Sequence, residues 1–115
     1  MTETPIQKQI IDYLRAMDFL VFRQNAGRGR YNQHLAPNGT PDLQAVKRHR
    51  KKPLVVWIEV KAGKNKPTAE QREMHDELRA AGQIVITVRS LDEVREWVEP
   101  IRPPTGEQFP QEVQR

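Results

Sequence analysis

The stretch LVVWIEVKAG, residues 54–63, decides the fold because it has the pattern of a buried β-strand that ends in two charges. Side chains alternate between the two faces of a strand. One face is wholly apolar and consists of Leu54, Val56, Ile58 and Val60. The other face carries Glu59 and Lys61 side by side at its end. We expect a strand whose back lies in the core and whose end presents a carboxylate next to an ammonium group.

A partner strand is predicted at DLQAV, residues 42–46, joined to the strand 54–61 through the basic turn KRHRKKP. This arrangement indicates an antiparallel hairpin. The start of its first strand lies near the end of its second, which brings Asp42 close to Glu59. Two carboxylates about 4 Å apart repel by about 4 kcal/mol at an effective dielectric of about 20. A hard divalent cation with oxygen ligands relieves such repulsion, so the pair predicts a metal site.

The remaining elements follow from periodicity and capping signals. A helix is predicted over residues 5–17, with Thr4, Pro5 and Gln7 as its start, and a short strand follows at FLVFR, residues 19–23. Thr68 and Gln71 form a capping box before a helix from about 69 to 81. Gly82 ends that helix, a strand follows at 83–88, and a short helix runs from Ser90 to Pro100. The order α-β-β-β-α-β-α predicts an α/β fold, a mixed β-sheet flanked by helices.

Length and composition narrow the functional classes. A chain of 115 residues has room for one domain, predicted at residues 1–100, followed by a flexible proline-containing tail at 101–115. The chain has no cysteine, which excludes disulfide scaffolds, thiol nucleophiles and cysteine-bound zinc. Its apolar runs are too short to span a membrane, and its N-terminus lacks the pattern of a secretory signal. We therefore expect a cytoplasmic protein without a membrane partner.

Charge is unevenly distributed along the chain. Residues 1–22 carry a net charge of −1, residues 23–66 carry +9 and residues 67–115 carry −4. The basic middle favours contact with a polyanion. Its only two acids are Asp42 and Glu59, which would weaken phosphate binding unless a metal lay between them. With a phosphate present, Mg²⁺ on this pair would polarise a phosphoryl oxygen and activate a water, which Lys61 would orient.

A simpler interpretation competes with the metal site. Glu59 and Lys61 could form an exposed salt bridge, and Asp42 could be an unrelated turn residue after Pro41. A Glu-x-Lys triplet is common by chance. The Pro-Asp pair upstream, the hairpin geometry and the scarcity of other acids in the basic middle favour the metal site.

These residues resemble a known family. Pro41-Asp42 and then Glu59-Val60-Lys61 after an apolar strand resemble the signature of the PD-(D/E)xK nuclease superfamily. A wider set of segments resembles the virus-type replication-repair nuclease domain, VRR-Nuc, over residues 3 to about 95. These segments are Glu3 before the first helix, NAGRGR, NGTPDLQAV, IEVKAG and TAEQREMHDELRAAGQIVITVRS.

The resemblance implies a restriction-endonuclease-like core and hydrolysis of DNA with Mg²⁺, or Mn²⁺ as its substitute. Asp42 and Glu59 match the family's metal-binding carboxylates, and the Val60 carbonyl matches its backbone ligand. Lys61 matches the catalytic lysine. Glu3 matches an acidic residue that reaches the metal directly or through water. A further match is Gln71, which falls on a glutamine that could support Lys61 or a phosphate.

The resemblance also implies a substrate. Small stand-alone members include dimeric enzymes that act on four-way (Holliday) DNA junctions, so we expect a homodimer acting on branched DNA in a bacterial or phage-infected host cell. A nuclease for flaps or DNA ends is an alternative. A second class is a non-catalytic nucleic-acid-binding module that uses the basic middle for phosphate contact.

Candidate DNA contacts lie in two loops. Asn25, Arg28 and Arg30 belong to a Gly- and Arg-rich loop that could bind phosphate or simply be solvated. Lys64 and Lys66 follow the predicted metal site and are better placed. The turn at 47–52 is either a DNA contact or a solubilising hairpin tip. The three histidines are scattered, which argues against a zinc site.

Overall fold

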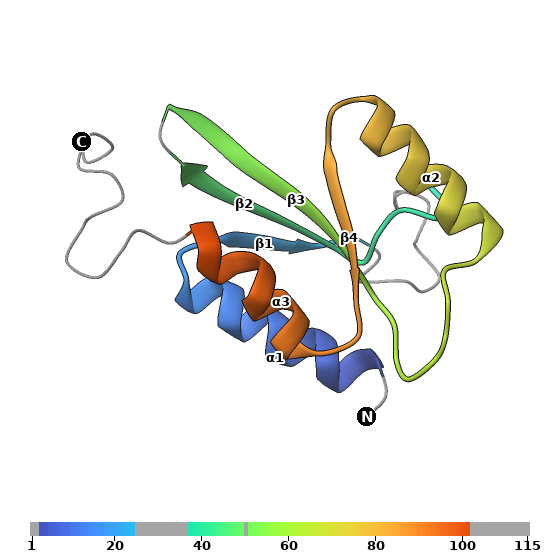
Figure 1. Cartoon of the computed structure of the whole chain (residues 1–115), viewed down its shortest axis with the longest axis horizontal. Coiled ribbons are helices and arrows are strands. Elements are labelled where there is room, and N and C mark those ends of the chain that lie inside the picture. Colours follow the sequence, from blue (N-terminus) through green and yellow to red (C-terminus); the bar gives the residue numbers. More distant parts are fainter. Residues whose placement is uncertain (1–2, 25–36, 50, 102–115) are drawn as a thin grey trace, which may run out of the picture.

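A computed structural model of the chain describes residues 3–24, 37–49 and 51–101. Figure 1 shows its mixed α/β architecture, and the predicted element order is confirmed. The elements in chain order are α1 (Glu3–Ala16), β1 (Leu20–Arg23), β2 (Leu43–His49), β3 (Lys52–Val60), α2 (Ala69–Ala80), β4 (Ile84–Val88), α3 (Leu91–Val98) and the short 3-10 helix η1 (Glu99–Ile101).

The strands form one sheet in the order β1-β2-β3-β4. The first two pairs are antiparallel, and β4 returns through α2 to run parallel to β3. The predicted hairpin is confirmed, with Leu43 opposite Ile58 and His49 opposite Lys52. Its strands reach further than predicted, because most of the basic segment expected as a turn continues the β-ladder.

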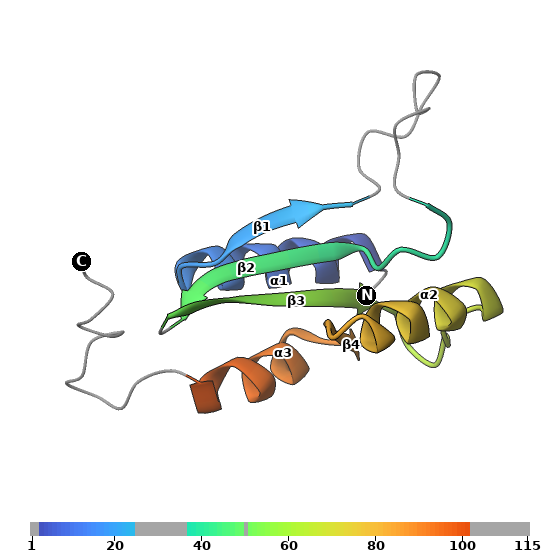
Figure 2. The ribbon, with the colours of Figure 1, turned by 90° about the horizontal axis from the view of Figure 1, so that it is seen from above.

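Two helices cover one face of the sheet and the third lies against the other. In Figure 1, α1 and α3 lie together below the strands, while α2 lies above them near β4. The apolar face of β3 packs against α1 and α3 as predicted. The core there includes Ile10, Leu14, Val56, Ile58, Val60, Val94 and Val98, all at most 1% exposed. Figure 2 shows α2 near the end of β3.

Lys47 shows why the basic turn is shorter than predicted. Its side chain lies on the core face of β2 and is only 6% exposed. Its Nζ donates a 2.8 Å hydrogen bond to the Met17 carbonyl just after α1, and it lies 5.1 Å from the centre of the Phe19 ring. Lys47 therefore links β2 to the end of α1 and does not belong to a hairpin tip.

The helix boundaries agree with most of the predicted signals. Helix α1 begins at Glu3, two residues before the predicted start, so Thr4 lies inside its first turn. The capping box of Thr68 and Gln71 is present at α2, and Gly82 follows that helix with a φ of +86°, a value that glycine adopts without strain. Within the described segments, no helix has the length and apolar character to cross a membrane. The predicted tail lies outside the described residues, except for residue 101.

Candidate active site

The start of β2 and the end of β3 bring Asp42 and Glu59 together, as the hairpin predicted. Asp42 directly precedes the pairing of Leu43 with Ile58. The Val60 amide donates a 2.8 Å hydrogen bond to Asp42 Oδ2. One residue later, the Lys61 amide donates to the Val88 carbonyl at 3.0 Å. The backbone that carries the site is therefore fixed by strands on both sides.

Glu59 and Lys61 lie side by side and are both buried. Glu59 is 1% exposed and Lys61 is 8% exposed, and their charged groups approach to 3.7 Å between Nζ and Oε2. The exposed salt bridge considered as the simpler interpretation is therefore wrong. Burying charged groups is unfavourable unless each group has a partner. The burial of Glu59 and Lys61 therefore points to a functional role.

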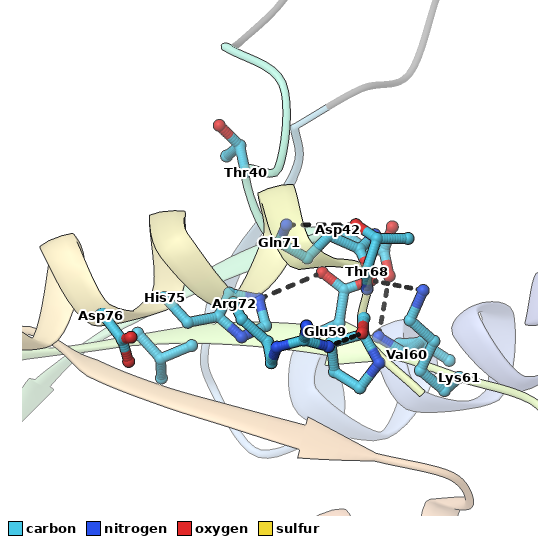
Figure 3. A network of polar contacts seen from close by, with 12 residues as sticks. Thr40, Asp42, Glu59, Val60, Lys61, Thr68, Gln71, Arg72, His75 and Asp76 are labelled. Carbon is cyan, nitrogen blue, oxygen red and sulfur yellow. Dashed lines mark hydrogen bonds and ion pairs between the residues drawn. The ribbon is translucent and has the colours of Figure 1, made fainter. Parts of the chain in front are cut away.

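Gln71 links the start of α2 to Glu59 (Figure 3). Its Oε1 accepts a 2.8 Å hydrogen bond from the Thr68 amide, which closes the capping box. Its Nε2 donates a 3.3 Å hydrogen bond to Glu59 Oε2. We predicted that Gln71 would support Lys61 or a phosphate, but in this structure its amide supports the carboxylate.

The two central carboxyls both have raised pKa values. Burial, together with the neighbouring charge of Asp42 and a hydrogen bond to it, raises the pKa of Glu59 to about 8. Burial also raises the pKa of Asp42, against the hydrogen bonds from Val60 and Glu59, which lower it. Without a cation, Glu59 is therefore mostly protonated near pH 7.

Glu3 lies at the first residue of α1 and is half-buried. Its charge raises the pKa of both Asp42 and Glu59, which places it within electrostatic reach of the pair. Among the described residues, no group of three or more His, Asp or Glu side chains could hold a metal by itself. A cation here would therefore take its remaining ligands from backbone carbonyls, water or a bound phosphate.

A groove of about 350 Å³ opens beside the carboxyl pair. It lies between the turn at residues 37–40 and the first turn of α2, and it is also lined by Asp42 and Gln71. Gly39 allows this close approach, because a Cβ there would come within 2.5 Å of the Glu70 carbonyl oxygen. Gly39 also has a φ of +88°, which favours glycine. The groove gives a bound group access to the site.

Comparison with solved structures supports the resemblance to VRR-Nuc nucleases. No family model matches the sequence, and no curated protein matches it. A solved structure of a VRR_NUC domain is similar to this chain, with a TM-score of 0.65 and 26% sequence identity over 84% of this chain and 94% of that one. This similarity supports the resemblance to the VRR-Nuc family. Its mixed sheet with flanking helices is the restriction-endonuclease-like fold of a VRR-Nuc nuclease domain.

The predicted DNA contacts of this chain are placed only in part. Lys64 and Lys66 are exposed in the loop after β3, one and three residues after Gly63. Asn25, Arg28 and Arg30 lie outside the described residues. Contact between the Gly- and Arg-rich loop and DNA therefore stays a prediction. Lys64 and Lys66 lie on the surface near Lys61.

Sequence reasoning missed one residue of the candidate site. His75 on α2 is 3% exposed, and its Nε2 lies 3.4 Å from Glu59 Oε1. Burial lowers the pKa of His75, and the charge of Arg79 lowers it further, so the ring is neutral near pH 7. The signal was available, because His75 follows Gln71 by four residues and therefore shares its face of the helix. The histidines were considered only as zinc ligands, so the position of His75 beside Glu59 was not predicted.

Proposed function

We propose that this chain is a metal-dependent nuclease that hydrolyses DNA phosphodiester bonds. The observation that carries the proposal is the convergence of Asp42, Glu59 and Lys61 at one end of a core strand, with Glu59 at 1% and Lys61 at 8% exposure. A binding module would gain nothing from the buried Glu59 and the half-buried Asp42, because both carboxylates repel phosphate. A hydrolase needs them to hold a cation beside its lysine.

The donor set fits Mg²⁺, with Mn²⁺ as its substitute. Asp42 and Glu59 supply carboxylate oxygens at one end of β3. Burial raises the pKa of both groups, and the charge of Asp42 raises the pKa of Glu59 further, an effect that a cation would counter. Mg²⁺ is commonly held by one or two carboxylates together with water and substrate phosphate. Asp42 and Glu59 would hold it, with the Val60 carbonyl and with Glu3 through water. When bound, it supplies Lewis-acid stabilisation of the phosphoryl oxygens and a more acidic water.

The side chains of the protein perform the remaining tasks. The Lys61 ammonium orients the attacking water and offsets negative charge that develops on the phosphate. The water loses a proton to solvent as its oxygen forms a bond to phosphorus. The bond from phosphorus to one sugar oxygen breaks, and that oxygen takes up a proton from solvent. Gln71 holds Glu59 in place through its 3.3 Å hydrogen bond. The groove beside Asp42 receives the scissile phosphate.

A second, basic groove extends this path for DNA. It has a volume of about 330 Å³ and lies along α1 and the end of β1, where Lys8, Arg15 and Arg23 outnumber the single acid Asp12. Arg23 pairs with Leu43, the sequence neighbour of Asp42, so the groove lies at the same end of the sheet as the carboxyl pair. We propose that the DNA backbone runs from this groove across the site toward Lys64 and Lys66.

The substrate we propose is branched DNA, with the four-way junction as its main form. Paired cuts in a junction need two sites, so the proposal includes a homodimer. Leu20 and Phe22 on edge strand β1 are 65% and 50% exposed and lie on one side of the strand. They offer an apolar surface for the second copy.

The test uses labelled four-way junctions, flaps, single strands and linear duplex, each with Mg²⁺, Mn²⁺ or EDTA. We expect metal-dependent, symmetric cuts in the junction by the wild-type protein and no cuts by Lys61→Ala. Lys52→Ala is the matched control, because Lys52 is an exposed lysine at the opposite end of the same strand. It should cleave like the wild type.

Other outcomes separate the alternatives. Cuts restricted to flaps or free ends would retain the nuclease and replace its substrate. Binding that persists in EDTA, with no cleavage under any metal, would favour a non-catalytic nucleic-acid-binding module. A monomer at working concentration, with junction cuts unaffected by Leu20→Ser and Phe22→Ser, would contradict the homodimer.

A further inference from the structure

His75 and Gln71 contact the same carboxylate from one face of α2. They are four residues apart, so their side chains project in the same direction. Gln71 Nε2 donates to Glu59 Oε2 at 3.3 Å, while His75 Nε2 lies 3.4 Å from Glu59 Oε1 (Figure 3). Each oxygen of Glu59 therefore faces its own neighbour on the helix.

The contact between His75 and Glu59 is close but incomplete. A separation of 3.4 Å satisfies the distance for an ion pair but is long for an N–H···O hydrogen bond. Both atoms are buried, and neither has a hydrogen-bond partner among the described residues. A buried polar atom without a partner costs about 1–3 kcal/mol. A shift of a few tenths of an ångström toward each other would satisfy both atoms at once.

The other oxygen of Glu59 has a different set of neighbours. Oε2 accepts from Gln71 and lies 3.7 Å from Lys61 Nζ. The final torsion of a glutamate side chain is broad and roughly two-fold, so packing alone does not select which oxygen faces the site. Fixing Oε1 on the histidine would fix Oε2 on the side of Lys61.

We propose that His75 is a positioning residue, whose Nε2–H holds Glu59 Oε1 so that Oε2 stays directed toward Lys61 and the cation. This inference rests on the proposed metal-dependent function. It gives His75 a role in the site that does not follow from the spacing of Asp42, Glu59 and Lys61. Groups that hold a metal ligand in place commonly affect metal affinity by about 10–100-fold.

The test compares two substitutions that differ in the donor. His75→Gln keeps an N–H donor at nearly the same distance from the backbone, whereas His75→Leu fills the space without one. Mn²⁺ affinity is measured by calorimetry without DNA, and thermal unfolding in EDTA verifies the fold. We expect His75→Leu to bind Mn²⁺ at least about tenfold more weakly than the wild type. His75→Gln should stay within about threefold of the wild type.

Two results would overturn the inference. Wild-type Mn²⁺ affinity in His75→Leu would mean that the contact is irrelevant to the site. Equal weakening in His75→Gln and His75→Leu would mean that the ring acts only by packing. His75→Met replaces the leucine variant if that protein does not fold. Failure of the wild-type protein to bind Mn²⁺ would instead contradict the proposed metal-dependent function, so the two failures are distinguishable.

Discussion

Strand β3 buries apolar side chains on one face and an ionisable side chain on the other, and the two kinds of burial have opposite energetic effects. On one face, Val56, Ile58 and Val60 are at most 1% exposed and pack against α1 and α3. On the other, Glu59 is equally buried but ionisable, and its pKa is raised to about 8. Apolar burial contributes about 25 cal/mol per Å² to stability, whereas burial of a carboxylate opposes folding. One strand thus anchors the fold on one side and holds a destabilising site on the other.

The largest expected effect is the loss of DNA cleavage when a carboxylate of the site is replaced. Asp42→Asn keeps the size of the side chain but removes its charge, so cleavage should fall at least about 1,000-fold, or about 4 kcal/mol in activation free energy. Circular dichroism should show an intact fold. Asp76→Asn makes the same chemical change on an exposed part of α2 and should cleave normally. Substantial cleavage by Asp42→Asn would remove this residue from the site.

Substitutions on the apolar face of β3 should instead lower the stability of the fold. Ile58→Ala deletes a side chain that is 1% exposed, so the free energy of unfolding should fall by about 2–5 kcal/mol. Ile84→Ala makes the same change at an edge position that is 39% exposed, and it should cost less than about 1 kcal/mol. Urea unfolding measures both. Full stability of Ile58→Ala would contradict the conclusion that the apolar face of β3 stabilises the fold.

The destabilising nature of Glu59 should appear as a pH dependence in EDTA. Its folded pKa is about 8 against an ordinary value of 4.5, so the folded state binds more protons between these values. Stability therefore falls as pH rises through this window. Glu59→Gln does not titrate, so its melting temperature should exceed that of the wild type by about 4 °C or more at pH 8 and by less at pH 5. A difference that stays constant with pH would contradict the assignment.

The smallest expected effect concerns the DNA path beside the site. Replacing Lys8 and Arg23 by glutamine removes two positive charges from the basic groove. Junction affinity of the Lys61→Ala protein in Mg²⁺ should fall about fivefold, or about 1 kcal/mol, with a weaker salt dependence. The control replaces Lys51 and Lys52 by glutamine at the distant hairpin end. Equal losses in both would indicate only a general charge effect.

The sequence predicted the fold where local signals were strong. The alternation in residues 54–61 predicted β3 and its apolar face, and the hairpin rule placed Asp42 next to Glu59. The capping box of Thr68 and Gln71 predicted the start of α2. In each case, periodicity or a specific hydrogen bond between near neighbours determined the outcome.

The contacts that α2 makes were not predictable from such local signals. They depend on how a helix docks on a sheet, which placed Gln71 on Glu59 rather than on Lys61 and put His75 beside them. Lys47 was misassigned for a related reason. A lysine in a basic run predicts a surface turn, but its position in the β-ladder directs it to the core side, where the Met17 carbonyl accepts its hydrogen bond.

The hydrogen bond from the Val60 amide to Asp42 provides a built-in spectroscopic reporter. The Val60 nitrogen lies 2.8 Å from Asp42 Oδ2, so the electronic environment of this N–H depends on the charge of the Asp42 carboxylate. Its proton chemical shift in an NMR spectrum should therefore move when Asp42 gains a proton or takes up a cation. A titration followed at this one resonance would register events at the site without any substrate and without any substitution.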